Sequence, residues 1–333
     1  MNQVLVAIAA ALLGWGLTGL ALAFVRRREH LAMPTERGLH AAPTPVGGGL
    51  GLIGATLALW MILHWPLPSS GTLVALGVVV LGVISWLDDR QPLPPIVRLT
   101  AQALVVFITL WSLPAAARIV PAWPLGLERA ALAFGWLWMT NLTNFMDGVD
   151  GLAGTEAATV GLGYAIVTHM APSPAAIPSQ LPDLALILTF AALGYLVWNW
   201  APARIFMGDV GSIPLGFLLG LFMLDLAYRG LWAAALILPL YFIADATTTL
   251  LDRLGRGAKP WQAHREHAYQ RAVLSGLSHA VVVLHIAVLN AALVALAVLS
   301  ISAPWNALAA AGGLTAALLA WFRTRAVTPA KAS

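Results

Sequence analysis

Residues 4–28 read VLVAIAAALLGWGLTGLALAFVRRR, an apolar run that meets charge only at Arg26, Arg27 and Arg28. About 20 consecutive apolar residues are enough for a helix to cross a lipid bilayer. No basic residue precedes the run, which argues against a cleavable signal peptide. We therefore expect a retained membrane anchor.

The same pattern recurs along the whole chain of 333 residues, of which 60% are hydrophobic and 10% are charged. Apolar runs predict about eleven spans, with centres near residues 14, 56, 79, 105, 138, 161, 191, 218, 240, 289 and 313. The predicted fold class is an all-α polytopic integral membrane protein, forming one domain over residues 1–333. Cysteine is absent, which excludes disulfides and thiolate metal sites.

Basic residues decide the predicted orientation. With the N-terminus outside, 15 of the 18 Lys and Arg residues fall in cytoplasmic segments, and only Arg118, Arg129 and Arg229 lie outside. The positive-inside rule therefore predicts a cytoplasmic C-terminus. Eleven of the 14 carboxylates share the cytoplasmic side. We expect Asp225, at an outer helix end, to be solvated.

The carboxylates gather in cytoplasmic loops, predicted at about residues 26–45, 88–95, 141–154, 200–211 and 251–277. Asp88 and Asp89 end the third span, and such a pair needs a compensating cation, either an arginine (Arg90 or Arg98) or a metal. A solvated loop is the plain alternative. Ionisable groups beside membrane spans generally mark function.

Residues 141–154, NLTNFMDGVDGLAG, combine amides, carboxylates and glycines in 14 positions. On a helix, Asp147 and Asp150 would share a face, as would Asn141 and Asn144. A Gly-rich helix end would explain one carboxylate but not the whole set. Asp209, in FMGDVGS (residues 206–212), is by itself only a candidate N-cap. With Asp147 or Asp150 it would supply the few carboxylate oxygens that Mg²⁺ needs.

A basic segment follows the ninth span and contains Arg253, Arg256, His264, Arg265 and His267. Two histidines three apart suggest zinc, but further ligands are missing. Arginine forks and imidazoles suit a diphosphate better. Attraction to anionic lipid is the simpler reading of the arginines, although it leaves the histidines unexplained. We read His279 and His285 as histidines of the helix bundle.

Together these motifs resemble the polyprenyl-phosphate N-acetylhexosamine-1-phosphate transferase family. The matching elements are PTPVGGG (43–49), WLDDR (86–90), NLTNFMDGVDGLAG, WNWAPARIFMGDVGS (198–212) and AHREHAY (263–269). They cover most of the chain in the family's order. HREH stands where the phospho-MurNAc-pentapeptide branch has three consecutive histidines, which favours the branch that initiates O-antigen and related cell-envelope glycans, including lipopolysaccharide.

The resemblance implies transfer of a sugar 1-phosphate from a UDP-N-acetylhexosamine, such as the GlcNAc or FucNAc derivative, to undecaprenyl phosphate with release of UMP. It implies Mg²⁺ dependence, with Mn²⁺ as an alternative metal, and a site on the cytoplasmic face of the bacterial inner membrane. By motif position, the implied roles are metal binding by Asp209 and Asp147, catalysis by Asp88, Asp89, Asp147, Asp150, His264 and His267, and substrate binding by Asn141, Asn144, Asn199 and Phe206. Arg253, Arg256 and Arg265 are added as substrate-binding residues from their charge.

Three alternatives stay open. Phospho-MurNAc-pentapeptide transfer in peptidoglycan synthesis uses the same chemistry. A secondary transporter would explain the spans, but it predicts repeated halves and charges near the midplane, which the sequence lacks. A non-catalytic lipid-binding scaffold would leave residues 141–154 without a role. We expect lipids and no nucleic acid as partners, and the sequence leaves open a homodimer.

Overall fold

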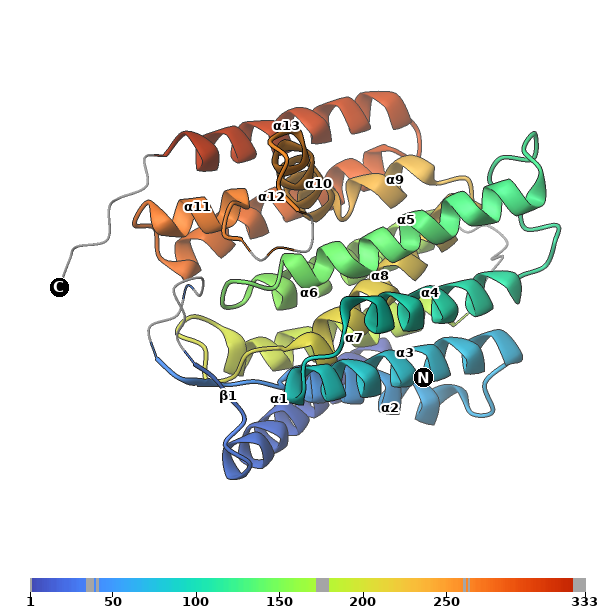
Figure 1. Ribbon diagram of the computed structural model, residues 1–333. Coiled ribbons are helices and arrows are strands. Elements are labelled where there is room, and N and C mark those ends of the chain that lie inside the picture. The colour runs from blue at the N-terminus through green and yellow to red at the C-terminus, as the bar shows by residue number, and fades with distance from the viewer. Residues whose placement is uncertain are drawn as a thin grey trace.

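The computed structural model describes residues 2–33, 39, 42–171, 180–259, 262 and 264–325. Most of these residues are helical, and Figure 1 shows the long helices packed side by side. The helices are α1 (Gln3–Arg27), α2 (Gly49–His64), α3 (Ser69–Arg90), α4 (Pro95–Trp111), α5 (Leu125–Phe145), α6 (Leu152–Met170), α7 (Leu181–Asn199), α8 (Asp209–Tyr228), α9 (Trp232–Ile237), α10 (Leu240–Gly255), α11 (Ala268–Leu274), α12 (His279–Leu299) and α13 (Pro304–Thr324).

The helices confirm an all-α protein of membrane type. Among the described residues, six helices are long and apolar enough to cross a membrane by length and composition, namely α1, α3, α7, α8, α12 and α13. α2 and α4 are shorter apolar helices. Each predicted span centre lies within a helix. The count of eleven spans and the orientation of the termini remain predictions.

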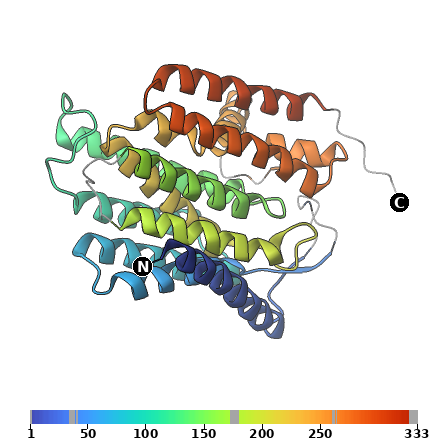
Figure 2. The ribbon, with the colours of Figure 1, turned by 180° about the vertical axis from the view of Figure 1, so that it is seen from behind.

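The ninth predicted span differs from the expectation of one continuous helix. The chain forms α9, turns at Leu238 and Pro239, and continues as α10. Proline lacks a backbone N–H and its ring clashes with the preceding turn of a helix, which explains the break at Pro239. Figures 1 and 2 show α10 turned out of the direction that most helices share.

Helix α8 is the centre of the bundle. It packs against α2, α3, α5, α6 and α9, and 89% of its most apolar 18-residue window is buried inside the protein. A helix that is apolar on all sides either faces lipid or is buried in protein, and α8 is buried in protein. The position of its first residue, Asp209, is therefore fixed by the packing of α8 among its neighbouring helices.

Asp225, near the other end of α8, is fully buried, so the expectation of a solvated side chain is wrong. It accepts hydrogen bonds from the Tyr164 hydroxyl and from Nε of Arg229. A buried carboxylate is tolerated when cationic and hydroxyl donors compensate its lost hydration.

The three glycines at 47–49 pack against the FMGD segment at residues 206–209. The strands β1 (Leu31–Ala32) and β2 (Thr44–Pro45) form an antiparallel pair, and Val46 forms a parallel bridge with Phe206. The N–H groups of Gly47 and Gly48 donate to the Phe206 carbonyl at 3.1 and 2.8 Å. A Cβ on Gly49 would lie 2.1 Å from Cα of Gly211, so only glycine permits this approach of α2 to α8.

These loops gather at one end of the molecule. Figure 1 shows β1, α11 and the turn between α5 and α6 at the same end of the bundle. Of the predicted loop at 26–45, residues 34–38, 40 and 41 lie outside the described residues, as do 260, 261 and 263 of the predicted loop at 251–277. The predicted site residues all lie within the described part.

Candidate active site

Asp209 is held at the start of α8 by an amide and an arginine. Nδ2 of Asn144 donates to its Oδ1 at 2.7 Å and also to Oγ of Ser212 at 2.9 Å. Nη1 of Arg98 lies 3.5 Å from Oδ2 of Asp209. Asn144 and Asp209, 65 residues apart in sequence, are therefore in direct contact.

The two carboxylates at the end of α3 have different hydrogen-bond partners. Asp88 is buried, and its carboxylate accepts from Nη1 of Arg98 at 2.6 Å and from the N–H of Leu93 at 2.7 Å. Asp89 accepts from the N–H groups of Asp209 and Val210. The cation beside Asp88 is Arg98; Arg90 instead lies over the Trp86 ring at 5.7 Å.

Asp147 and Asp150 lie in the turn between α5 and α6, so the expectation that they share a helical face is wrong. Gly151 precedes α6 with φ of 82°, a left-handed conformation that glycine adopts without strain. A chain that turns back within these few residues cannot also be helical through Asp147. The structure groups these carboxylates through the turn instead.

The surroundings of Asp147 are unusually acidic. Burial and the neighbouring carboxylates of Asp209, Asp89 and Asp150, in that order, raise the pKa of Asp147 well above its usual range. Asp150 is compensated differently: its Oδ2 accepts from the N–H of Ala203 at 3.0 Å and lies 3.3 Å from Nδ1 of His279. His279 therefore contacts the turn between α5 and α6 (residues 146–151, the acidic turn), a contact that the sequence did not indicate.

Asn141 and Asn199 have separate partners. Nδ2 of Asn141 donates to Oε1 of Gln102 at 2.8 Å. Asn199 is buried; its Oδ1 accepts from the N–H of Gly151 at 3.0 Å and its Nδ2 donates to the Ile205 carbonyl at 2.9 Å. Asn199 thus joins the acidic turn to the segment before Phe206. A uridine contact by Asn199 or Phe206 stays a prediction.

His264 and His267 lie together, with ring centroids 4.9 Å apart. Burial, followed by the nearby His267 and Arg253, lowers the pKa of His264 to about 4. His264 is therefore neutral at physiological pH. His267 is almost completely buried at the start of α11.

The predicted substrate-binding arginines Arg253, Arg256 and Arg265 do not line the cavity that His264 and His267 line. Arg253 and Arg256 both form ion pairs with Glu266, and Arg256 also pairs with Asp252 at 3.0 Å. Hydrogen bonding to Arg256 and Arg253 lowers the pKa of Glu266. Arg265 is exposed. Glu266 and Asp252 thus balance the charges of the two arginines that the sequence assigned to a diphosphate.

A cavity of about 550 Å³ is lined by Asp209 and by the two histidines, whereas Asp88, Asp89, Asp147 and Asp150 are not part of its lining. Its wall is largely apolar and includes Leu81, Leu99, Phe134, Leu137, Trp138 and Leu250. Its polar lining includes Arg98, Asn141, Asn144, Asp209, His264 and His267. Ser85, Gln102, Gln262 and Gln270 also belong to this lining and were not among the predicted site residues. One chamber therefore offers an apolar surface and a charged, hydrogen-bonding surface to the same ligand.

The carboxylates fit a hard divalent cation. No three His, Cys, Asp or Glu side chains in the described part of the chain form a complete metal-binding group. Mg²⁺ does not require one, because it usually takes one or two carboxylates and fills its remaining positions with water and substrate phosphates. Asp209 and Asp147, whose like charges repel, are oxygen donors of the kind that Mg²⁺ prefers.

A bundle of apolar helices, with a cavity lined by Asp209 and with Asp88 and Asp89 in contact with that lining, defines an integral membrane protein with an enzyme-like site. The family model for glycosyl transferase family 4 matches residues 72–227. The match includes the Asp88 pair, the acidic turn and Asp209.

Curated relatives extend this match over most of the chain. A probable undecaprenyl-phosphate N-acetylglucosaminyl 1-phosphate transferase of Bacillus subtilis (strain 168) is 26% identical over 258 residues, which cover 75% of this chain and 72% of that protein. A decaprenyl-phosphate N-acetylglucosaminephosphotransferase of Mycobacterium leprae (strain TN) is 28% identical, with 84% and 79% covered. A phospho-N-acetylmuramoyl-pentapeptide-transferase of Microcystis aeruginosa (strain NIES-843 / IAM M-2473) is 33% identical, with 73% and 72% covered.

The chain belongs to glycosyl transferase family 4. It is an enzyme of the sugar-1-phosphate transferase type.

Proposed function

We propose that this protein transfers an N-acetylhexosamine 1-phosphate from a UDP-sugar to undecaprenyl phosphate and releases UMP. An oxygen of the lipid phosphate attacks the sugar-bearing phosphorus, and the bond from that phosphorus to the oxygen bridging it to the nucleotide phosphate breaks. UMP leaves with that oxygen. One diphosphate linkage replaces another, so no separate energy source is needed.

The observation that carries this proposal is the two-sided lining of the cavity. Apolar side chains such as Phe134 and Leu137 suit a prenyl chain, while Arg98 and Asn144 lie at the polar surface beside Asp209. A lipid phosphate needs both surfaces at once. Phosphoryl transfer depends mainly on alignment and on electrostatic stabilisation, and these residues supply both.

Mg²⁺ is the proposed cofactor, held by Asp209 and Asp147. When bound, it would neutralise phosphate charge that the protein alone leaves unbalanced. Arg98 orients the acceptor phosphate beside Asp88, and Asn144 fixes the Asp209 carboxylate. His264 and His267 donate hydrogen bonds to the diphosphate or the sugar. A phosphate monoester has a second pKa near about 6, so a strong general base is unnecessary.

Direct attack has one competitor, a covalent phosphoaspartate formed at Asp147. The two routes differ when the acceptor is absent. Protein incubated with a radiolabelled UDP-sugar and Mg²⁺ but no lipid should carry no sugar phosphate. A labelled peptide containing Asp147 would establish the covalent route instead.

We further propose eleven spans, with the N-terminus outside, the C-terminus in the cytoplasm and the site at the inner face of the bacterial cytoplasmic membrane. The asymmetric distribution of Lys and Arg supports this orientation. Because the chain has no cysteine of its own, a single introduced cysteine reports on which side of the membrane its segment lies. An impermeant maleimide applied to intact spheroplasts should label Ala122→Cys and spare Ala258→Cys, and the reverse pattern would invert the proposed topology.

The glycan served is proposed to be an O-antigen or a similar cell-envelope polymer. The HREH sequence supports this branch, whereas the relative from Microcystis aeruginosa supports pentapeptide transfer as a second candidate. Purified protein should be incubated with Mg²⁺, undecaprenyl phosphate and a panel of UDP-N-acetylsugars, including UDP-MurNAc-pentapeptide. Mass analysis of the lipid product identifies the sugar. Absence of any diphosphate-linked lipid would refute the proposed function.

A further inference from the structure

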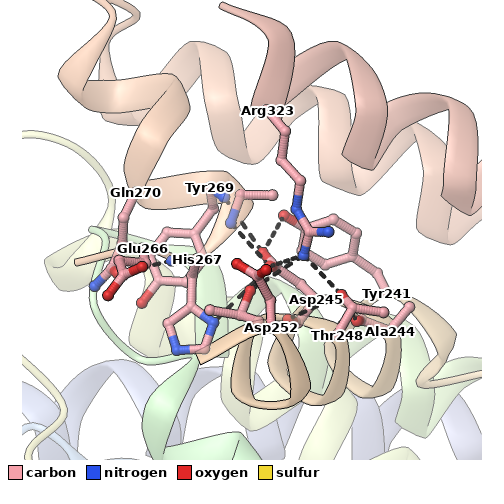
Figure 3. A network of polar contacts seen from close by, with 12 residues as sticks. Tyr241, Ala244, Asp245, Thr248, Asp252, Glu266, His267, Tyr269, Gln270 and Arg323 are labelled. Carbon is pink, nitrogen blue, oxygen red and sulfur yellow. Dashed lines mark hydrogen bonds and ion pairs between the residues drawn. The ribbon is translucent and has the colours of Figure 1, made fainter. Parts of the chain in front are cut away.

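Asp245 is a fully buried carboxylate outside the predicted set of site residues. Within α10 it accepts from the Tyr241 hydroxyl at 3.2 Å and from Oγ1 of Thr249 at 3.1 Å. It also accepts from the N–H groups of Ala268 and Tyr269 at 2.8 and 3.3 Å. Figure 3 shows the carboxylate between α10 and the start of α11. Such a concentration of donors compensates the cost of burying the charge.

The contact with Ala268 and Tyr269 fixes the beginning of α11. The first N–H groups of a helix have no partners within the helix, and an anion there also interacts favourably with the helix dipole. In α11 this anion comes from α10, 23 residues earlier in the chain. Arg323 of α13 approaches the same carboxylate at 3.7 Å. Asp245 therefore joins three helices at one point.

His267 is the residue immediately before α11. Its Nδ1 lies 3.8 Å from Oδ1 of Asp245 and has no hydrogen-bond partner among the described residues. A carboxylate beside Nδ1 favours the tautomer that carries its proton there. Nε2 then remains for a ligand in the cavity that His267 lines.

The far side of α11 contacts the acidic turn. The Tyr269 hydroxyl donates to the Phe145 carbonyl at 2.9 Å, two residues before Asp147. A Cβ added at Gly148 would lie 2.4 Å from that hydroxyl oxygen, so α11 is closely packed there. The side of α11 that faces the turn is therefore held by contacts of its own, which do not involve the Asp245 carboxylate.

We propose that Asp245 is the positioning residue for His267: it fixes the start of α11 and the imidazole orientation in the cavity. This inference rests on the proposed function, since it assigns Asp245 a part in the same reaction. Asp245 touches no ligand itself. Its effect on turnover passes through His267.

A double-mutant cycle tests this route. Asp245→Asn in the wild-type background should lower kcat about 10- to 100-fold, the usual effect of losing a group that orients a functional histidine, with KM for the UDP-sugar within about threefold. In a His267→Asn background, which keeps a favourable residue at the start of α11, the same change should lower kcat by less than about threefold. Equal losses in the two backgrounds would overturn the inference.

Two further variants make the cycle decisive. Asp252→Asn, on the same helix but exposed, is the matched control and should change kcat by less than about twofold. If Asp245→Asn protein does not fold, Thr249→Val removes one donor to Asp245 and keeps the charge. Its loss of kcat, about three- to tenfold, should likewise vanish in the His267→Asn background, and persistence of the loss would contradict the inference.

Hydrogen exchange tests the inference without turnover. Amide exchange in a peptide covering 264–275 should accelerate at least about tenfold in Asp245→Asn and stay unchanged in Asp252→Asn. Unchanged exchange in Asp245→Asn would show that Asp245 does not fix α11. If wild-type protein releases no UMP, the proposed function fails, and the exchange result still decides the role of Asp245 in fixing α11.

Discussion

The carboxylate of Asp89 caps the helix that begins at Asp209. Its two oxygens accept from the backbone N–H groups of Asp209 and Val210, each at 3.1 Å. The residues are 120 positions apart, and an aspartate at the end of α3 satisfies the unpaired donors of α8. The carboxylates of Asp89 and Asp209 are thereby held close together despite their mutual repulsion.

Asp89→Asn should weaken this cap, because the amide retains one acceptor oxygen for two N–H groups. We expect the free energy of unfolding to fall by about 0.5–2 kcal/mol, the usual range for a lost N-cap. UMP release should also fall, because Asp209 loses its fixed position. Thermal unfolding and turnover in detergent measure the two effects. Reduced turnover with an unchanged unfolding midpoint would show that Asp89 acts on substrate and not as a cap.

Gly208→Ala should also weaken the contact between Asp89 and the start of α8, because Gly208 directly precedes that helix. Gly208 has φ of +74°, and an added Cβ would lie 2.9 Å from Oδ2 of Asp89. Gly257 has a similar φ of +76° but open space around it, so Gly257→Ala carries the backbone strain alone. We expect Gly208→Ala to be less stable than Gly257→Ala by about 1–3 kcal/mol, as for overpacked sites. Equal unfolding midpoints would contradict the clash.

Arg98→Gln should impair the reaction more than Arg90→Gln. Arg98 contacts Asp88 and lies near Asp209, whereas Arg90 lies over Trp86. Loss of a cation that balances two carboxylates and a phosphate should lower kcat/KM for the lipid acceptor at least about 100-fold. Arg90→Gln should stay within about threefold of wild type. Comparable losses in both variants would show that Arg98 does not have a specific role in balancing the carboxylates and the acceptor phosphate.

His264 should make stability depend on pH below neutrality. The pKa of His264 is lowered from its usual value of 6.5 to about 4, so the unfolded chain binds a proton in this window and the folded protein does not. The free energy of unfolding therefore falls as pH decreases from 6.5 to 4, by about 1 kcal/mol after solvent screening. His264→Gln should flatten this slope, while His285→Gln should preserve it. Unfolding midpoints in detergent across this pH range provide the comparison.

Much of the fold follows from hydropathy alone. Runs such as residues 4–25 and 279–299 have the length and composition of membrane helices, and these properties do not depend on distant contacts. The break at Pro239 was missed because the apolar run continues through it. Burial of Asp225 was missed because its partner Tyr164 comes from another helix.

The site was only partly readable from the sequence. The spacing of Asp147 and Asp150 indicated that they lie close together, but they lie in a turn before Gly151 and not on one face of a helix. Asp245 looked like one carboxylate among several, since neither its burial nor its contact with α11 has a local signature. The arginines beside Glu266 appeared free because an ion pair with a residue 10 to 13 positions away cannot be inferred from charge alone.

UMP release by the Asp209→Asn variant tests most directly whether the carboxylates form one phosphate-transfer site. With Mg²⁺, undecaprenyl phosphate and the preferred UDP-sugar, turnover should fall at least about 100-fold, while Asp183→Asn, far from the cavity, should retain wild-type turnover. Both variants should be recovered folded in detergent. Turnover of Asp209→Asn within about threefold of wild type would contradict the account.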